Sequence, residues 1–114
     1  MAVIHLVGDY SLTHTIETIK RELPKIAISL EFVDEGYINS DSISYLIVYE
    51  KYYMRVKNRV SLSIMLSEVN ARTEIIAIGS GAGQGALFSF DWGSEEDFVY
   101  DFTRLMESFN YHKI

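Results

Sequence analysis

The segment VSLSIMLS at residues 60–67 decides the fold class. Its even-numbered residues are all apolar, whereas three of its four odd-numbered residues are serine. Successive side chains of a β-strand point to opposite faces of the sheet, so this alternation predicts a strand with one buried and one solvated face. Half-buried strands are typical of antiparallel sheets, and the segment therefore predicts one.

Further strands are expected on both sides of this segment. Five segments alternate in the same way or form a short apolar run, and they are predicted as strands: residues 2–7, 26–32, 46–56, 74–78 and 86–92. Three stretches between them have the composition of turns: residues 34–36, 57–59 and 70–72. The sheet is thus expected to have four to six strands.

Two segments show the period of an amphipathic helix instead. The first stripe ends before Pro24 and can be capped by Ser11 or Thr13, and it comprises Leu12, Ile16, Ile19 and Leu23. The second helix is expected to begin with Ser94 as its N-cap and Asp97 as its third residue. Its apolar stripe comprises Phe98, Phe102, Leu105, Met106 and Phe109. Both stripes need an apolar surface to cover. We therefore expect a single α+β domain over residues 1–114, with both helices on one face of the sheet. A helix-grip arrangement, with a curved sheet around the C-terminal helix, is the alternative.

Composition excludes several classes of protein. The 114 residues contain no cysteine, which excludes disulfides, thiolate metal sites and a cysteine nucleophile. The net charge of −6 argues against nucleic acid or anionic lipid as the main partner. Apolar runs are far shorter than the roughly 20 residues of a membrane helix, and the first residues do not resemble a signal peptide. We expect a cytoplasmic protein that binds no membrane.

Three segments carry a family resemblance: EKYYMR at residues 50–55, GSGAGQG at residues 79–85 and FDWGSEEDF at residues 90–98. Together they resemble a family of small bacterial proteins of unknown function. The resemblance implies a bacterial, cytoplasmic origin, and it implies no activity, ligand or catalytic residue.

The glycine-rich segment is the first candidate site. Backbone amides approach an anion closely where side chains are absent, so a small-molecule or anion site here would use Gly79, Ser80, Gly81, Gly83, Gln84 and Gly85. However, residues 86–92 look like a strand, whereas a dinucleotide-binding loop opens into a helix. The other interpretation is a curved connection between two strands whose glycines permit positive φ angles.

Four basic residues form the second candidate. Lys51, Arg55, Lys57 and Arg59 have the same parity and would share one face near a turn, interleaved with Tyr49 and Tyr53. Basic residues among aromatic ones can bind single-stranded nucleic acid. Because the protein as a whole is acidic, the favoured interpretation is a solvated strand end whose charges discourage pairing at the sheet edge. The basic residues could instead meet the acidic residues at positions 91–101.

The sheet face opposite the helices is the third candidate. We expect Tyr45, Ile47, Tyr49 and Met65 on that face, where polar residues would be usual. An exposed apolar patch of this kind marks an interface, here for a homo-oligomer. Solvated tyrosines that shield the backbone are the alternative.

No catalytic residue, metal site or cofactor is predicted. His5, His14 and His112 are scattered, and Ile78 replaces the first glycine that a G-x-S-x-G motif around Ser80 would need. The sequence favours a non-enzymatic domain that self-associates or binds a protein partner. A small-molecule or anion binder, and an enzyme without a recognisable motif, are the alternatives.

Overall fold

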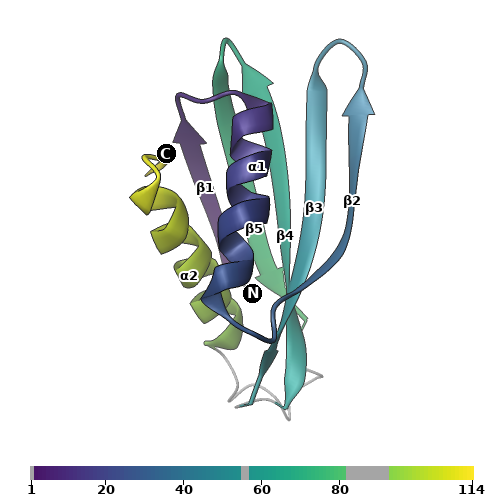
Figure 1. The fold of residues 1–114 in the computed structure, drawn as a ribbon, viewed down its shortest axis with the longest axis vertical. Coiled ribbons are helices and arrows are strands. Elements are labelled where there is room, and N and C mark those ends of the chain that lie inside the picture. Colours follow the sequence, from purple (N-terminus) through teal and green to yellow (C-terminus); the bar gives the residue numbers. More distant parts are fainter. Residues whose placement is uncertain (1, 55–56, 82–92) are drawn as a thin grey trace.

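Six β-strands form one antiparallel sheet in the computed structural model, which describes residues 2–54, 57–81 and 93–114 (Figure 1). The strands of this described part are β1 (Ala2–Gly8), β2 (Glu31–Asn39), β3 (Ile43–Tyr53), β4 (Asn58–Val69), β5 (Arg72–Ser80) and β6 (His112–Lys113). Their order across the sheet is β2-β3-β4-β5-β1-β6. The strand predicted at residues 86–92 lies outside the described residues.

Two α-helices lie side by side on one face of this sheet (Figure 1). They are α1 (Leu12–Glu22), which continues into the 3-10 helix η1 (Leu23–Ile26), and α2 (Ser94–Ser108). The predicted α+β architecture is therefore confirmed. The arrangement is the two-layer one and not the helix-grip alternative.

The helix ends follow their local chemistry, with two differences from the prediction. Ser11 caps α1 by accepting a hydrogen bond from the backbone N–H of His14 at 3.1 Å. Leu23 keeps helical angles (φ −60°, ψ −41°) although residues before proline usually avoid them, and the chain continues into η1 with Pro24 in its first turn, where the missing N–H costs little. The N-cap of α2 is Gly93, one residue before the predicted Ser94, and the carboxylate of Glu96 accepts a hydrogen bond from the Gly93 N–H at 2.8 Å.

The region between η1 and β3 differs most from the prediction. Most of the strand predicted at residues 26–32 is not formed, since Ile26 belongs to η1, Ile28 is fully exposed and the strand begins only at Glu31. Residues 34–36 are not a turn but the middle of β2, and the chain reverses at residues 40–42. Asp34, Glu35 and Gly36 are poor strand formers. They are tolerated because β2 is an edge strand, where charged side chains stay in water.

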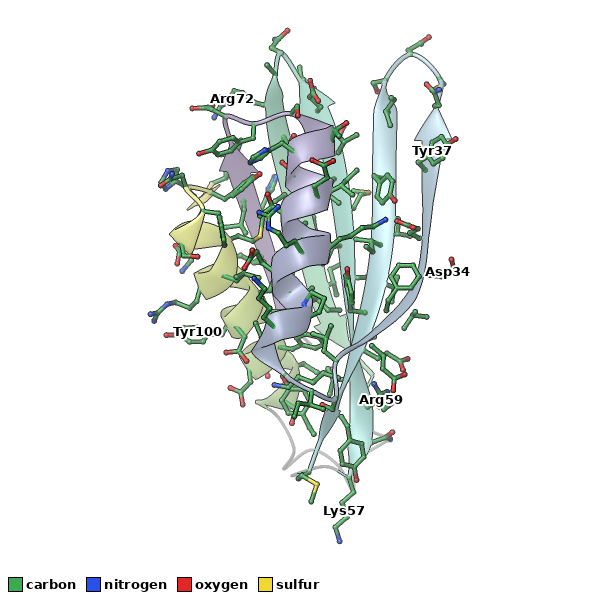
Figure 2. The ribbon with its side chains drawn as sticks, viewed as in Figure 1. Asp34, Tyr37, Lys57, Arg59, Arg72 and Tyr100 are labelled. Carbon is green, nitrogen blue, oxygen red and sulfur yellow. The ribbon has the colours of Figure 1, made fainter. Side chains whose placement is uncertain are left out.

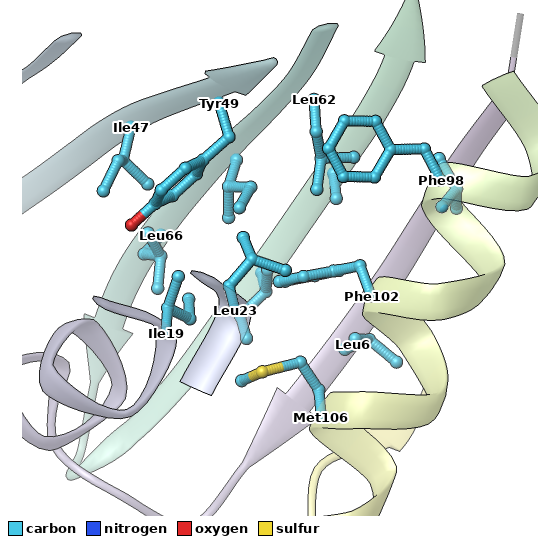
Figure 3. Packing of buried hydrophobic residues seen from close by; sticks show 14 of the residues in the cluster. Leu6, Ile19, Leu23, Ile47, Tyr49, Leu62, Leu66, Phe98, Phe102 and Met106 are labelled. Carbon is cyan, nitrogen blue, oxygen red and sulfur yellow. The ribbon is translucent and has the colours of Figure 1, made fainter. Parts of the chain in front are cut away.

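The core lies between the helices and the sheet (Figure 3). Both predicted helix stripes point into it, and Ile19, Leu23, Phe98, Phe102 and Met106 are completely or almost completely buried. The even-numbered apolar residues of β4 complete the other side of this layer, as the alternation predicted: Val60, Leu62, Ile64 and Leu66.

Candidate functional site

The register between β3 and β4 decides which residues share a face of the sheet. Lys51 lies opposite Val60 and Tyr53 opposite Asn58, so every odd-numbered residue of β3 opposes an even-numbered residue of β4. Directly opposed residues of an antiparallel pair point to the same face. Because even-numbered residues of β4 face the helices, the odd-numbered residues of β3 face the helices too.

The predicted placement of the tyrosine-rich face is therefore wrong for three of its four residues. Ile47 and Tyr49 are only 1% and 2% exposed and belong to the core, and Tyr45 packs against that core. Met65 alone lies on the open face, at 47% exposure, opposite Leu46. The prediction assumed that even-numbered residues of β3 and even-numbered residues of β4 lie on the same face. In the observed register they lie on opposite faces.

The same register divides the basic residues. Lys51 is on the helix side, with its Nζ 3.8 Å from a carboxylate oxygen of Asp101 and 4.5 Å from the ring centre of Tyr53. Arg59 is on the open side, where its Nε donates to Glu50 at 3.0 Å. The prediction of one shared basic face is wrong. Both charges are compensated within the chain.

The two remaining members of the basic set are placed differently. Lys57 is exposed beside the turn that leads into β4, and its φ is +50°. Arg55 lies outside the described residues. The alternative in which this segment meets the acidic residues of the C-terminal part holds for Lys51, which pairs with Asp101, and not for Arg59, which pairs with Glu50 and Glu31.

The described glycines of residues 79–85 serve packing and turning. A Cβ atom at Gly79 would lie 2.7 Å from the carbonyl oxygen of Glu95, so this glycine lets α2 approach β5. Ser80 pairs with Ser61 through its hydroxyl at 3.1 Å, and Gly81 has φ +102°. Gly83, Gln84 and Gly85 lie outside the described residues, so the ligand site predicted here stays a prediction.

The strand at the outer edge of the sheet, β2, is exposed along its whole length. All nine residues of β2 are exposed, although the strand pairs with β3 along its whole length. Figure 2 shows Asp34 and Tyr37 along this outer strand, on the side of the molecule away from α2. Its exposed apolar residues include Phe32 at 50%, Tyr37 at 67% and Ile38 at 69%. We call residues 31–39 the β2 edge.

Within the β2 edge, the missing side chain of Gly36 leaves a gap. Gly36, Leu46 and Met65 lie in one row across β2, β3 and β4. A Cβ atom at Gly36 would meet no other atom within 4 Å. A hollow of about 350 Å³ opens here, and its lining is Gly36, Tyr37, Ile38, Ser44, Tyr45, Leu46 and Met65. This hollow can accept an apolar side chain.

One polar cluster joins the β2 edge to α1. The Lys20 Nζ lies 2.6 Å from Oε1 of Glu35, and the Tyr45 hydroxyl donates to the same oxygen. The hydrogen bond from Lys20, together with that from Tyr45, holds the pKa of Glu35 below its usual value. The bond to Glu35 likewise raises the pKa of Lys20, whereas burial is the main cause that raises the pKa of Tyr45. The cluster compensates one of the carboxylates of β2.

Within the described residues there is no group of three or more histidine, aspartate or glutamate side chains that could hold a metal ion. In that same part of the chain, no helix is both long and apolar enough to cross a membrane. The β2 edge offers unpaired backbone groups, exposed apolar side chains and a hollow, which are the elements of strand addition.

Sequence reasoning missed the β2 edge because it read residues 34–36 as a turn. A signal was present at residues 40–42, where Ser40, Asp41 and Ser42 form a more regular turn composition between two segments rich in β-formers. With that turn, the β-forming residues Tyr37 and Ile38 would have extended the hairpin. The exposure of both faces of β2 could not have been found this way, because it depends on where the helices lie.

The fold defines the class: a two-layer α+β domain with two helices on an open antiparallel sheet. The chain belongs to the family of unknown function DUF6054, whose model matches residues 1–110. This confirms the resemblance to a family without an assigned function. A comparison with curated proteins found no match.

Proposed function

We propose that this protein is a non-enzymatic association domain that binds another polypeptide through the β2 edge and the hollow beside Gly36. One observation carries the proposal: β2 is paired with β3 from Glu31 to Asn39, with one bulge, yet all nine of its residues are exposed. A strand in this position gains little from burial within the monomer. A bound partner would cover its apolar side chains and satisfy its outer backbone groups.

The exposed apolar area supports this proposal. Single exposed apolar residues are ordinary, but contiguous ones mark interaction surfaces. Tyr37 and Ile38 are about two-thirds exposed, and Leu46 and Met65 of the adjacent strands are each 47% exposed. Complete burial of one such aliphatic side chain contributes about 1.5–3 kcal/mol. Covering this set is therefore a substantial driving force for association.

The alternatives have less support in the described residues. Gly79 is explained by the approach of α2, which removes one reason to read the glycine-rich segment as a ligand site. The cluster of Lys20, Glu35 and Tyr45 is engaged in its own ion pair and hydrogen bond. The bacterial and cytoplasmic setting stays a prediction from the sequence.

Site-specific photo-crosslinking in cells tests the proposal. A photoreactive benzoylphenylalanine replaces Ile38, at the β2 edge, and the matched control replaces Ile28, which is fully exposed between η1 and β2. We expect discrete protein adducts from position 38 and none of the same mass from position 28. Equal adduct patterns at the two positions, or no adduct at position 38, would contradict the proposal.

A further inference from the structure

We infer that the occupant of the β2 edge is a second copy of this chain, whose β2 pairs antiparallel to the first about a two-fold axis at Tyr37. This inference rests on the proposed function and names its partner. In such a dimer the two sheets join into one continuous sheet, with the helices of both copies on the same face. A two-fold interface of this kind uses the same patch on both subunits.

The two halves of β2 differ in their ability to pair. The first half contains a bulge between Phe32 and Asp34 and three charged residues, Glu31, Asp34 and Glu35, which are features that discourage pairing at a sheet edge. The second half, residues 36–39, is regular and uncharged. Strand addition is therefore expected at the second half.

Symmetry then limits the register. A two-fold axis normal to the sheet sets one residue of β2 opposite itself, and residues equally distant from it oppose each other on the same face. With the axis at Asp34 or Glu35, a carboxylate would oppose its own copy, which is unfavourable. With the axis at Gly36, the apolar Ile38 would oppose the charged Asp34. With the axis at Tyr37, neither conflict arises.

The Tyr37 register is also complementary in shape. It sets Ile38 of one copy opposite Gly36 of the other, where the side-chain position is empty. Ile38 of the second copy would thus extend the row of Gly36, Leu46 and Met65 and enter the hollow of about 350 Å³ that these residues line. The symmetry makes this contact twice.

The polar groups of the same register are complementary as well. Glu35 comes opposite Asn39 of the second copy, whose side-chain amide can donate to the carboxylate. Asp34 comes opposite Ser40, whose hydroxyl can do the same. The charge of Glu35 is already compensated by Lys20 at 2.6 Å, which lowers the charge repulsion between the two edges.

The area and the net charge set the expected strength. A short strand pair with its flanking side chains stays below about 1,200 Å² in total, which is the range of transient complexes. Each copy carries a net charge of −6, so the copies repel each other at long range and added salt screens this repulsion. We therefore expect a reversible dimer that becomes tighter as the salt concentration rises.

Disulfide trapping reads the register directly, because the chain has no cysteine of its own. Tyr37 is 67% exposed, so Tyr37→Cys leaves the core intact. In the proposed register the two introduced thiols face each other, and mild oxidation yields a covalent dimer. The control Glu35→Cys places its two thiols about 14 Å apart, four residues along the strands. That separation is too long for a disulfide.

The expected results are a fast covalent dimer from Tyr37→Cys, a slow or absent one from Glu35→Cys, and a wild-type dimer in sedimentation equilibrium. Ile38→Lys should weaken that dimer about tenfold or more, and Ile28→Lys should not. Equal trapping at positions 35 and 37 overturns the register. A monomeric wild type overturns the second copy as the partner. If position 38 then still crosslinks to a different protein in cells, the proposed function stands without this inference; if it does not, both fail.

Discussion

The hydrogen bond between Thr15 of α1 and Tyr111 near the C-terminus provides a quantitative test of the fold. The two oxygen atoms are 2.6 Å apart, and both side chains are completely buried. The Thr15 hydroxyl also donates to the carbonyl oxygen of Ser11 at 2.9 Å. A threonine hydroxyl has one proton, so Tyr111 must be the donor to Thr15. Burial raises the pKa of the Tyr111 hydroxyl, which keeps it protonated.

The two single substitutions should differ because only one leaves a buried polar group without a partner. Tyr111→Phe removes the donor while Thr15 keeps its bond to Ser11, so the free energy of unfolding should fall by about 1 kcal/mol. Thr15→Val leaves the buried Tyr111 hydroxyl without an acceptor and should cost about 2–3 kcal/mol. The double variant removes both groups, and its loss should be smaller than the sum by about 1–2 kcal/mol.

Urea unfolding followed by circular dichroism measures these differences. With a slope of about 2 kcal/mol per molar urea, the midpoint should move by about 0.5 M for Tyr111→Phe and by about 1 M or more for Thr15→Val. Tyr100→Phe is the control, since Tyr100 is 57% exposed and its hydroxyl accepts an exposed hydrogen bond from Arg104 at 2.8 Å. Additive losses in the double variant, or a larger loss for Tyr111→Phe than for Thr15→Val, would refute the assigned direction of the bond.

Two further predictions concern a pair of glycines and an ion pair. Gly79→Ala places a Cβ atom 2.7 Å from the carbonyl oxygen of Glu95 and should lower the free energy of unfolding by about 1–3 kcal/mol. Gly36→Ala adds its Cβ atom in open space and should leave the dilute monomer unchanged or stabilise it by up to about 1 kcal/mol. Equal losses in urea unfolding would contradict this difference. The lowered pKa of Glu35 means that its contribution is present above the ordinary glutamate pKa of about 4.3 and is lost as the pH falls through the lower folded-state value. Lys20→Met should therefore flatten the acid side of the pH dependence of the urea midpoint, and an unchanged acid side would count against the ion pair.

Much of the fold could be predicted because its signals are local. The stripes of α1 and α2 follow from residue spacing, and the alternation at residues 60–67 fixes which residues of β4 are apolar. The edge strand could not be predicted in the same way. Asp34, Glu35 and Gly36 have turn composition, and only pairing with β3 holds them in a strand.

The candidate site shows the same division. The sequence indicated that an uncovered apolar surface exists, but it assigned Ile47 and Tyr49 to that surface, and they lie in the core. A shift of one residue in register moves every side chain to the other face. The sequence therefore shows which residues of one strand share a face. Which face of the next strand lies beside it is set by the turn that joins the two strands.

The sequence by itself determined the α+β class, the two helix stripes and the half-buried character of the sheet, because these depend on the period of apolar residues along the chain. The tertiary structure alone decided that β2 lies at the edge of the sheet with all of its residues exposed, and that Leu46 and Met65, not Ile47 and Tyr49, meet solvent. Exposure depends on which strands become neighbours and where the helices pack. Those choices are made by contacts between residues far apart in the chain.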